Sequence, residues 1–473
     1  MISNKNITAC LMLGLLASPA LADNHATNNA AASYGPFPVT LKSYSGEQTD
    51  SVSYSGQIGR QLLHTSLKKA IATNAGIDTL RRYFNGDDGT LPILDPVSSA
   101  KFRVDHNDVN AISRTNLSDK AYRGSIAGWP GNLSGRQMLE QMLTRAAAVP
   151  NGYDAKHGYD YVQLVSKFTM GGVFYHQACD NYLDEKLEAG NKPNNKPYRD
   201  GAYYTGKEHS WDEAFGYWGA AAHGASLTAQ QNYAIAKKKD MVSADANADG
   251  MVNLKSEMNY AHAYYAASFD RGGNTNYYSI ITRAFIDGRQ IIADANGEAL
   301  SDTQRNALMG KARVICANWE RVIAEAVFKY AGSVYADLAK LKSGGDENTY
   351  RAYVKHWGEL KGFALSLHTS SQNLGELGRR IDGLIKFGPV VGGVVGGVVS
   401  ADITQNSRRV SGVDAAGTFT FQDASVDEYM LYMLRLQQVM EDEFGVVAKD
   451  NDRLADIANL AEKLGSAEGV END

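Results

Sequence analysis

The sequence predicts an all-α protein built from packed antiparallel helices, either as one bundle or as two pseudo-repeated halves. Three observations lead to this prediction. Only 10 of the 473 residues are proline, so long helices can run without interruption. From Tyr159 onward, apolar residues recur at helical spacing in nearly every ordered segment. The alternation of apolar and polar residues that indicates strands is scarce.

The chain begins with a pattern that is typical of an export signal. A short polar start with one lysine precedes the apolar run "ITACLMLGLLA", and Ala20-Leu21-Ala22 fits a small-x-small cleavage site. We therefore expect residues 1–22 to be a signal peptide that is cleaved near Ala22. The remaining protein would be periplasmic or secreted. Residues 23–50, rich in Asn, Ala, Ser and Gly, are predicted to be a linker or loosely packed entry segment.

The helical body is predicted to span residues 51–464. Its first helix has one apolar face, formed by Ile58, Leu62, Leu63, Leu67 and Ile71. Residues 85–133 contain recurrent Gly, Asn and Pro residues, which favour turns and loops, so this segment is predicted to be irregular. Ser134 is a candidate N-cap, and Ser301 with Gln304 forms a candidate capping box ahead of a long helix that ends near Lys342.

The C-terminal part contains the exceptions to this helical pattern. "GTFTFQD" at Gly417–Asp423 is predicted to form one hairpin edge, and the glycine–valine run at Phe387–Asp402 an apolar loop over the bundle. That run is too short and too rich in glycine to span a bilayer. Residues 465–473 are predicted to be a flexible tail.

Composition excludes some classes of protein. The formal net charge of −6 and the pI near 6.0 argue against a nucleic-acid partner. After the leader, no stretch has the roughly 20 apolar residues of a membrane-spanning helix. Beyond the leader the chain has two cysteines, Cys179 and Cys316. A disulfide and two buried free thiols are both compatible with their apolar helical surroundings.

Two stretches each place a histidine and a carboxylate on one helical face. In "KHWGELKGF", His356 precedes Glu359 by three residues, and in "EHSWDEAFGY" His209 precedes Asp212 and Glu213 by three and four. Residues at these spacings are neighbours on a helix, so five side chains could converge if the two helices face each other. Such a nitrogen and oxygen set suits iron, zinc, manganese or copper. Ordinary surface salt bridges are the alternative explanation.

The pattern of His356 and Glu359 resembles a known family. His356-x-x-Glu359 is similar to the H-x-x-E signature of imelysin-like proteins, which are exported bacterial proteins often linked to iron uptake. The chain over about Tyr34–Leu454 also resembles a related secreted family in "SVSYSGQIGR", "HSWDEAFGYW", "DANADG" and "HWGELKGF". Imelysin-like proteins usually carry glycine where this chain has Val354. The resemblance implies two helical bundles, iron as the favoured metal, and His356 and Glu359 as its ligands.

A separate stretch, "DANADGMVNLKSE", starts like an EF-hand loop. Its candidate calcium ligands are Asp245, Asn247, Asp249, the carbonyl of Met251, and Glu257, which lies one residue beyond the usual twelfth position. Helices are predicted on both sides of the loop, so calcium would clamp a helix hairpin. An Asx-rich turn without an ion is the alternative.

The function predicted from these patterns is that of an exported metal-binding protein in iron acquisition or handling, with a structural calcium loop. Its partner would be a metal ion or a small iron-containing ligand, and an outer-membrane uptake receptor fits the same role. The alternative is a periplasmic polysaccharide-binding protein that uses tyrosine-rich surfaces such as "GAYYTG" and "AHAYYAASFD". Because H-E-x-x-H, G-x-S-x-G and P-loop motifs are absent, no enzyme is predicted.

Overall fold

Fifteen α-helices form the body of the computed structural model, which describes residues 33–370, 374–395, 398–399 and 402–468. Up to residue 244 the α-helices are α1 (Ser55–Ala72), α2 (Ile77–Asn85), α3 (Val109–Ile112), α4 (Gly135–Ala147), α5 (Tyr161–Thr169), α6 (Gly206–Trp218), α7 (Ala229–Ala236) and α8 (Met241–Ala244). The later ones are α9 (Ala261–Asp270), α10 (Tyr277–Asp294), α11 (Asp302–Lys342), α12 (Glu347–Leu367), α13 (Gly375–Ile385), α14 (Val426–Phe444) and α15 (Ile457–Glu468). The all-α prediction is confirmed.

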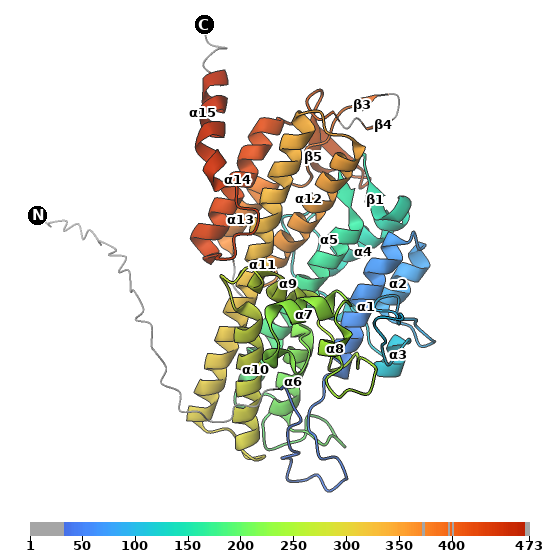
Figure 1. Cartoon of the computed structure of the whole chain (residues 1–473), viewed down its shortest axis with the longest axis vertical. Coiled ribbons are helices and arrows are strands. Elements are labelled where there is room, and N and C mark those ends of the chain that lie inside the picture. Colours follow the sequence, from blue (N-terminus) through green and yellow to red (C-terminus); the bar gives the residue numbers. More distant parts are fainter. Residues whose placement is uncertain (1–32, 371–373, 396–397, 400–401, 469–473) are drawn as a thin grey trace, which may run out of the picture. The chain divides into compact units, whose positions relative to one another are not determined.

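Helix α11 is the central element of this body. Its 41 residues correspond to about 60 Å of helix. Helix α10 packs beside its N-terminal part, and α12 and α14 pack beside its C-terminal part (Figure 1). The connection from α11 to α12 is only residues 343–346, so the two helices run antiparallel.

The two predicted helix starts are confirmed. The Ser134 hydroxyl accepts a hydrogen bond from the Gln137 amide, and the Gln137 side chain accepts one from the Ser134 amide. Ser301 and Gln304 make the same reciprocal pair ahead of α11. Both are capping boxes, which satisfy amides that a helix leaves unpaired in its first turn.

Helix α5 continues beyond Thr169 as two π-helical segments, Met170–Tyr175 and Gln177–Tyr182. The second segment carries Cys179, which forms a disulfide with Cys316 of α11, with Cα atoms 5.7 Å apart. Of the two alternatives for these cysteines, the disulfide is therefore the one found. It ties the end of the α5 segment to the central helix.

The described part of the predicted linker belongs to the folded body. Tyr34, Phe37 and Leu41 are buried, and the Tyr34 ring stacks on Phe215 of α6 with centroids 3.7 Å apart. The prediction that this whole segment is loosely packed is therefore corrected from Tyr34 onward. Its aromatic side chains supply apolar surface that α6 would otherwise expose.

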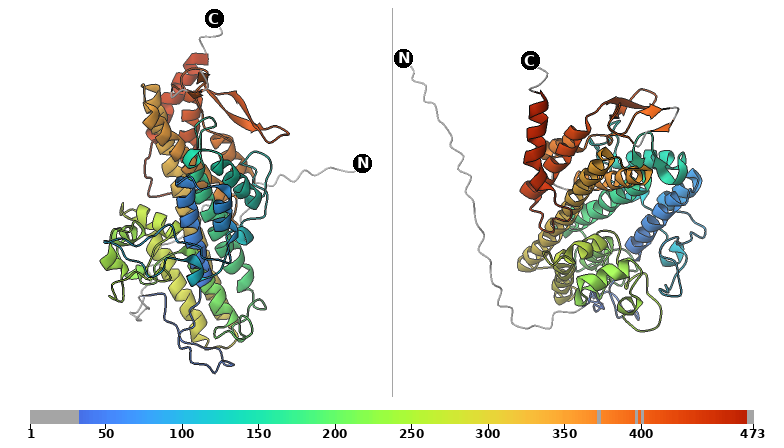
Figure 2. Two further views of the ribbon diagram at one scale, coloured as in Figure 1. Left: turned by 90° about the vertical axis from the view of Figure 1, so that its right-hand side faces the viewer. Right: turned by 45° about the horizontal axis from the view of Figure 1, so that its top comes forward.

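Strands are confined to three short antiparallel pairs among the described residues. They are β1 (Tyr153–Asp154) with β2 (Tyr159–Asp160), β3 (Val394–Val395) with β4 (Val398–Val399), and β5 (Arg408–Val413) with β6 (Phe419–Asp423). The last pair, with Val413 opposite Phe419, confirms the predicted hairpin edge. It projects from the helices in the left view of Figure 2.

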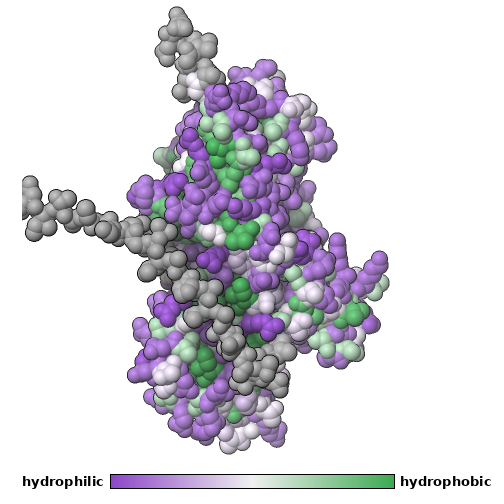
Figure 3. All heavy atoms as spheres, turned by 60° about the vertical axis from the view of Figure 1, so that its left-hand side comes forward, coloured by the Kyte–Doolittle hydropathy of each residue, from purple (hydrophilic) through white to green (hydrophobic). Residues whose placement is uncertain are grey.

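No helix among the described residues combines the length and apolar character needed to cross a lipid bilayer. On the face shown in Figure 3, hydrophilic residues predominate and apolar residues occur in separate small groups. The predicted signal peptide, residues 1–22, lies outside the described residues.

Candidate functional site

Helices α6 and α12 share the spacing W-x-E-x-x-G, which ends at Gly216 in α6 and at Gly362 in α12, and both glycines lie at close contacts between helices. A Cβ atom at Gly362 of α12 would lie 2.6 Å from Cβ of Lys167 in α5. In the same way, a Cβ at Gly216 of α6 would lie 2.6 Å from Cβ of Gln57 in α1. Only glycine permits helices to approach this closely. In α12 the consequence is that Lys167 of α5 lies beside Glu359.

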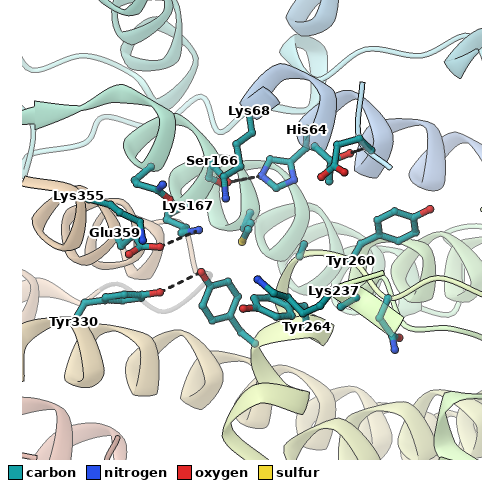
Figure 4. A pocket seen from close by; sticks show the side chains of 18 of the residues that line it. His64, Lys68, Ser166, Lys167, Lys237, Tyr260, Tyr264, Tyr330, Lys355 and Glu359 are labelled. Carbon is teal, nitrogen blue, oxygen red and sulfur yellow. Dashed lines mark hydrogen bonds and ion pairs between the residues drawn. The ribbon is translucent and has the colours of Figure 1, made fainter. Parts of the chain in front are cut away.

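A cavity of about 710 Å³ opens at this contact (Figure 4). Its walls come from α1, α5, α9, α11 and α12, with added residues from the segments around 95, 237 and 259. We call it the lysine pocket because six lysines line it: Lys68, Lys167, Lys237, Lys238, Lys329 and Lys355. The carboxylates that line it are Asp95 and Glu359. Its volume is in the range of small-molecule sites.

Three of the six lysines are paired with carboxylates. Lys238 is paired with Asp95, Lys329 lies 2.8 Å from Asp450, and Nζ of Lys167 lies 3.6 Å from Oε1 of Glu359.

The other three lysines have no such partner. Among the described residues, no ion pair joins Lys68, Lys237 or Lys355 to a carboxylate. The pocket therefore holds an excess of positive charge in a protein whose net charge is negative.

Lys68 and Lys167 form the innermost part of this charge. Lys167 is only 2% exposed, whereas Lys68 is partly exposed. The positive charge of Lys167, followed by burial, lowers the pKa of Lys68 to about 7. Burial also lowers the pKa of Lys167, and the neighbouring Glu359 opposes that change.

His64 lies next to this pair and is neutral. Its Nε2 is 3.0 Å from both the carbonyl oxygen and Oγ of Ser166, while Nδ1 has no hydrogen-bond partner among the described residues. Burial lowers the pKa of His64 to about 3. Because Nε2 faces a carbonyl oxygen, it carries the proton, and Nδ1 keeps a free lone pair.

Tyrosines form the rest of the wall. Tyr260, Tyr264, Tyr265 and Tyr330 all line the cavity, and the hydroxyls of Tyr265 and Tyr330 are 3.5 Å apart. Nζ of Lys237 lies 5.6 Å from the centre of the Tyr264 ring. In Figure 4, Tyr264 and Lys237 lie across the pocket from Lys68 and Lys167. Aromatic faces and ammonium groups thus surround the same space.

The predicted metal ligands of α12 line this pocket, but each has a partner of its own. Nδ1 of His356 is 2.6 Å from Oδ2 of Asp337 in α11, and Glu359 is engaged by Lys167. The i, i+3 spacing was correct in placing both at one site. The sequence did not indicate that α5 would supply a cation there.

The predicted ligands of α6 belong to a different region. Nε2 of His209 lies 3.8 Å from Glu213, and the His209 ring stacks on Tyr204. Burial lowers the pKa of His209 to about 4. Helices α6 and α12 lie at different ends of α11 in Figure 1, so the two faces do not meet.

Asp212 is part of what we call the arginine network: Arg289, Asp212, Glu208, Tyr34 and Ser51. Nε of Arg289 donates to Oδ1 of Asp212 over 2.9 Å, Nη1 lies 3.4 Å from Glu208, and Nη2 donates to Ser51 over 2.6 Å. Asp212 also accepts from the Tyr34 hydroxyl over 2.6 Å. Burial raises the pKa of the Asp212 carboxyl to about 6, against the opposing effect of Arg289.

The predicted calcium loop closes on its own backbone. Asp245 accepts from the amides of Asp249 and Gly250 at 3.1 and 2.8 Å. Glu257 accepts from the amides of Ala246 and Asn253 at 3.1 and 2.7 Å. Asn247 also accepts from the Asp249 amide, over 3.0 Å.

The flanks of this loop differ from the prediction. The entering helix, α8, has four residues, and α9 begins only at Ala261, after an irregular stretch. A buried asparagine, Asn259, accounts for that stretch, because its side chain accepts from the Ala221 amide and donates to the Asn232 carbonyl. The helices do not enclose the loop as they do in an EF-hand.

Within the described ranges, no group of three or more His, Cys, Asp or Glu side chains is arranged to hold a metal ion. The five-ligand site predicted for α6 and α12 is therefore not formed there. Transition-metal binding and calcium binding stay predictions. Sequence reasoning also missed Lys68 and Lys167, although a lysine inside the apolar run "QLVSKFTM" was a usable signal of a buried charge.

Comparison with known proteins gives one match. Residues 147–296 match the model of a family described as a domain of unknown function, DUF4856. That region includes Lys167, Lys237 and Tyr264 of the lysine pocket, while Lys68 and Glu359 lie outside it. No curated protein and no solved structure matches the chain. The resemblance to imelysin-like proteins stays a prediction.

Proposed function

We propose that this protein binds a small organic anion, one with a carboxylate or phosphate group on a ring-bearing body, in the lysine pocket. The observation that carries the proposal is that three lysines at one cavity have no carboxylate partner in the described part of the chain. Clustered ammonium groups repel one another, and a bound anion removes that repulsion. Charge-assisted hydrogen bonds to the anion supply affinity.

The tyrosine wall supports the second half of the proposal. A sugar or other ring laid against Tyr264 would find apolar contact on its face and hydroxyl groups at its edge. An acidic sugar has both a ring and an anionic group. The sequence-based alternative, a polysaccharide-binding protein with tyrosine-rich surfaces, and the positive charge of the pocket therefore favour the same ligand class.

The proposal is tested by titration calorimetry with glucuronate, glucose 6-phosphate, citrate and inorganic phosphate, with glucose as the neutral control. We expect the anions to bind and glucose not to bind. Lys68→Met and Lys355→Met should each weaken binding by about tenfold, the value of one hydrogen bond to a charged group. Lys69→Met is the matched control, because Lys69 is the next residue of α1 and is exposed. If no anion binds, or if Lys69→Met weakens binding equally, the proposal is wrong.

Metal binding is a second candidate, because His356 and Glu359 line the same pocket. If the metal ion is held in an anionic chelate, the negative charge of the chelate would pair with the lysine ammonium groups, and the metal would need no ligands from the protein. Comparing ferric citrate with citrate separates this case from simple anion binding. Metal analysis of an Asp245→Ala/Asp249→Ala variant beside the wild type tests the calcium loop.

We infer that the protein works in an oxidising compartment. The disulfide between Cys179 and Cys316 supports this inference, since disulfides persist outside the reducing cytosol. N-terminal sequencing of protein recovered from the periplasm tests it, and a start near Asp23 is expected.

A further inference from the structure

We propose that the lysine pocket selects an anion whose ring carries hydroxyl groups, and that His64 and Gln163 accept hydrogen bonds from those hydroxyls. The ligand class is then a hydroxylated ring with an anionic group, as in a sugar acid or a sugar phosphate. This inference rests on the proposed function, because it names the class of ring-bearing anion that the same cavity takes and the residues that select it.

Two buried acceptor atoms at the cavity have no hydrogen-bond partner among the described residues. They are Nδ1 of His64 and Oε1 of Gln163. Both residues line the cavity, and they are only 3% and 7% exposed. Buried polar atoms are almost always hydrogen-bonded, and an atom left unpaired costs free energy. Two such atoms at one cavity indicate a ligand that supplies the missing donors.

The spacing of residues on α5 brings the two acceptors to one part of the cavity. Gln163, Ser166, Lys167 and Met170 all line it, and they follow one another at i, i+3, i+4 and i+7, which is the spacing of a single helical face. His64 contacts this face at Ser166, where its Nε2 lies 3.0 Å from the carbonyl oxygen (Figure 4). That contact is about one helical turn from Gln163. Both acceptors therefore lie close to the Lys167 ammonium.

His64 presents an acceptor because of the contact that its other ring nitrogen makes. The carbonyl oxygen of Ser166 has no hydrogen to donate, so Nε2 carries the proton of the neutral ring. A second proton on the ring would add another positive charge beside the lysines, which disfavour it. Nδ1 therefore keeps its lone pair, and it needs a donor.

The anionic group of the ligand cannot be that donor. Ammonium groups only donate hydrogen bonds and a carboxylate only accepts them, so the anion pairs with the lysines. The hydrogens for His64 and Gln163 must come from elsewhere on the ligand. An amino group would donate, but the surrounding lysines repel its positive charge. A hydroxyl group is an uncharged donor, and a sugar ring carries several.

One ligand can then satisfy all three parts of the cavity. Its anionic group pairs with the lysines, its hydroxyls donate to His64 and Gln163, and one face of its ring lies against Tyr264. A ring acid without hydroxyl groups would bury the two acceptors and leave them unpaired. A site that hydrogen-bonds a hydroxyl group discriminates in this way against an analogue that lacks it.

The first test compares ligands that differ only in their hydroxyl groups. Titration calorimetry on the wild type measures glucuronate beside tetrahydropyran-2-carboxylate, which has the same ring and carboxylate. We expect glucuronate to bind about a hundredfold more tightly, from about tenfold for each acceptor that gains a partner. Glucose 6-phosphate beside tetrahydropyran-2-ylmethyl phosphate makes the same comparison for a sugar phosphate, and it distinguishes a phosphate from a carboxylate as the preferred anion.

Variants then assign the selectivity to residues. Gln163→Leu should weaken glucuronate binding about tenfold and leave the affinity for tetrahydropyran-2-carboxylate unchanged, because the second ligand has no hydroxyl to lose a partner. His64→Phe should have the same effect. Gln177→Leu is the matched control, because Gln177 is a buried glutamine on the continuation of α5 that does not line the cavity. It should leave the ratio of the two affinities unchanged.

Stability distinguishes binding from a structural role. Gln163→Leu should not lower the melting temperature of the free protein, because the oxygen that it removes has no partner in the described part of the chain. A variant that loses affinity for both ligands equally would contradict the inference. Circular dichroism establishes that each variant is folded. If His64→Phe does not fold, Gln163→Leu and the ligand comparison on the wild type decide.

The outcomes separate this inference from the proposed function. If the members of each ligand pair bind equally well, the selection of hydroxyl groups is wrong and the anion-binding proposal stands. A Gln177→Leu variant that lowers the ratio as much as Gln163→Leu does would also contradict the inference. If none of the four anions binds, both proposals fail.

Discussion

The lysine pocket and the arginine network are built from the same kinds of side chains, and they differ in how their charges are balanced. Arg289 is fully buried, and every polar contact around it is with a carboxylate or hydroxyl of the protein itself. In the lysine pocket, by contrast, ammonium groups outnumber carboxylates beside an open cavity. The arginine network satisfies its one guanidinium with two carboxylates and a hydroxyl of the protein, which holds the fold together. We propose that the unpaired ammonium groups beside the cavity bind a ligand instead. Charge content alone does not distinguish the two.

The largest expected effect is in the arginine network. Arg289→Met should lower the free energy of unfolding by about 3–5 kcal/mol, because it leaves Asp212 and Glu208 buried without their cation. Urea denaturation measures this. Lys311→Met removes a partly exposed partner of Asp287 and should cost at most about 1 kcal/mol. A loss below about 1 kcal/mol in Arg289→Met would show that the network does not act as a unit.

The disulfide should come next. Replacing both Cys179 and Cys316 by alanine should lower the free energy of unfolding by about 2–4 kcal/mol, since the bond closes a long loop in the unfolded chain. Affinity for anions should stay within about twofold, because neither cysteine lines the lysine pocket. A large loss of affinity in folded protein would instead link the disulfide to the shape of the pocket.

Lys68→Met should separate stability from binding. Its affinity for anions should fall about tenfold, while its melting temperature should rise, because the repulsion between Lys68 and Lys167 disappears. Thermal scans and calorimetry on one preparation measure both. If melting temperature and affinity fell together, the lysine would have a structural role like that of Arg289.

The same lysine gives a signed pH dependence. Its pKa is about 7 in the folded protein and near 10.5 when unfolded, so between these values the unfolded chain binds the extra proton. Stability from this group therefore rises with pH across that window, by at most about 1.4 kcal/mol per pH unit. Denaturation curves at several pH values should show that the free energy of unfolding of the wild type rises with pH more steeply than that of Lys68→Met. Equal slopes in the two proteins would contradict the assignment of this pH dependence to Lys68.

The smallest effect is expected for the histidine that the sequence placed at a metal site. His356→Ala should cost about 1 kcal/mol of stability through the lost contact with Asp337, and should change anion affinity less than twofold. Loss of iron from purified protein in this variant would contradict that expectation and restore His356 as a metal ligand.

Local features of the fold were predictable because their causes are local. The capping boxes at Ser134 and Ser301, and the hairpin edge at Gly417–Asp423, depend on residues within a few positions of one another. The i, i+3 spacing likewise placed His356 and Glu359 at one site. The EF-hand pattern did not predict the flanking structure for the same reason, since it describes a loop and cannot show that the buried side chain of Asn259 holds an irregular stretch between the loop and α9.

The sequence by itself determined the helical class, the helix starts and which residues carry charge. Only the tertiary structure decided which charges are neutralised, because that depends on contacts between distant segments. Arg289 meets Asp212 and Ser51 from two other parts of the chain, while Lys68 lines a cavity with five other lysines. A buried charge that meets an opposite charge inside the protein stabilises the fold, and long-range packing decides whether it has such a partner.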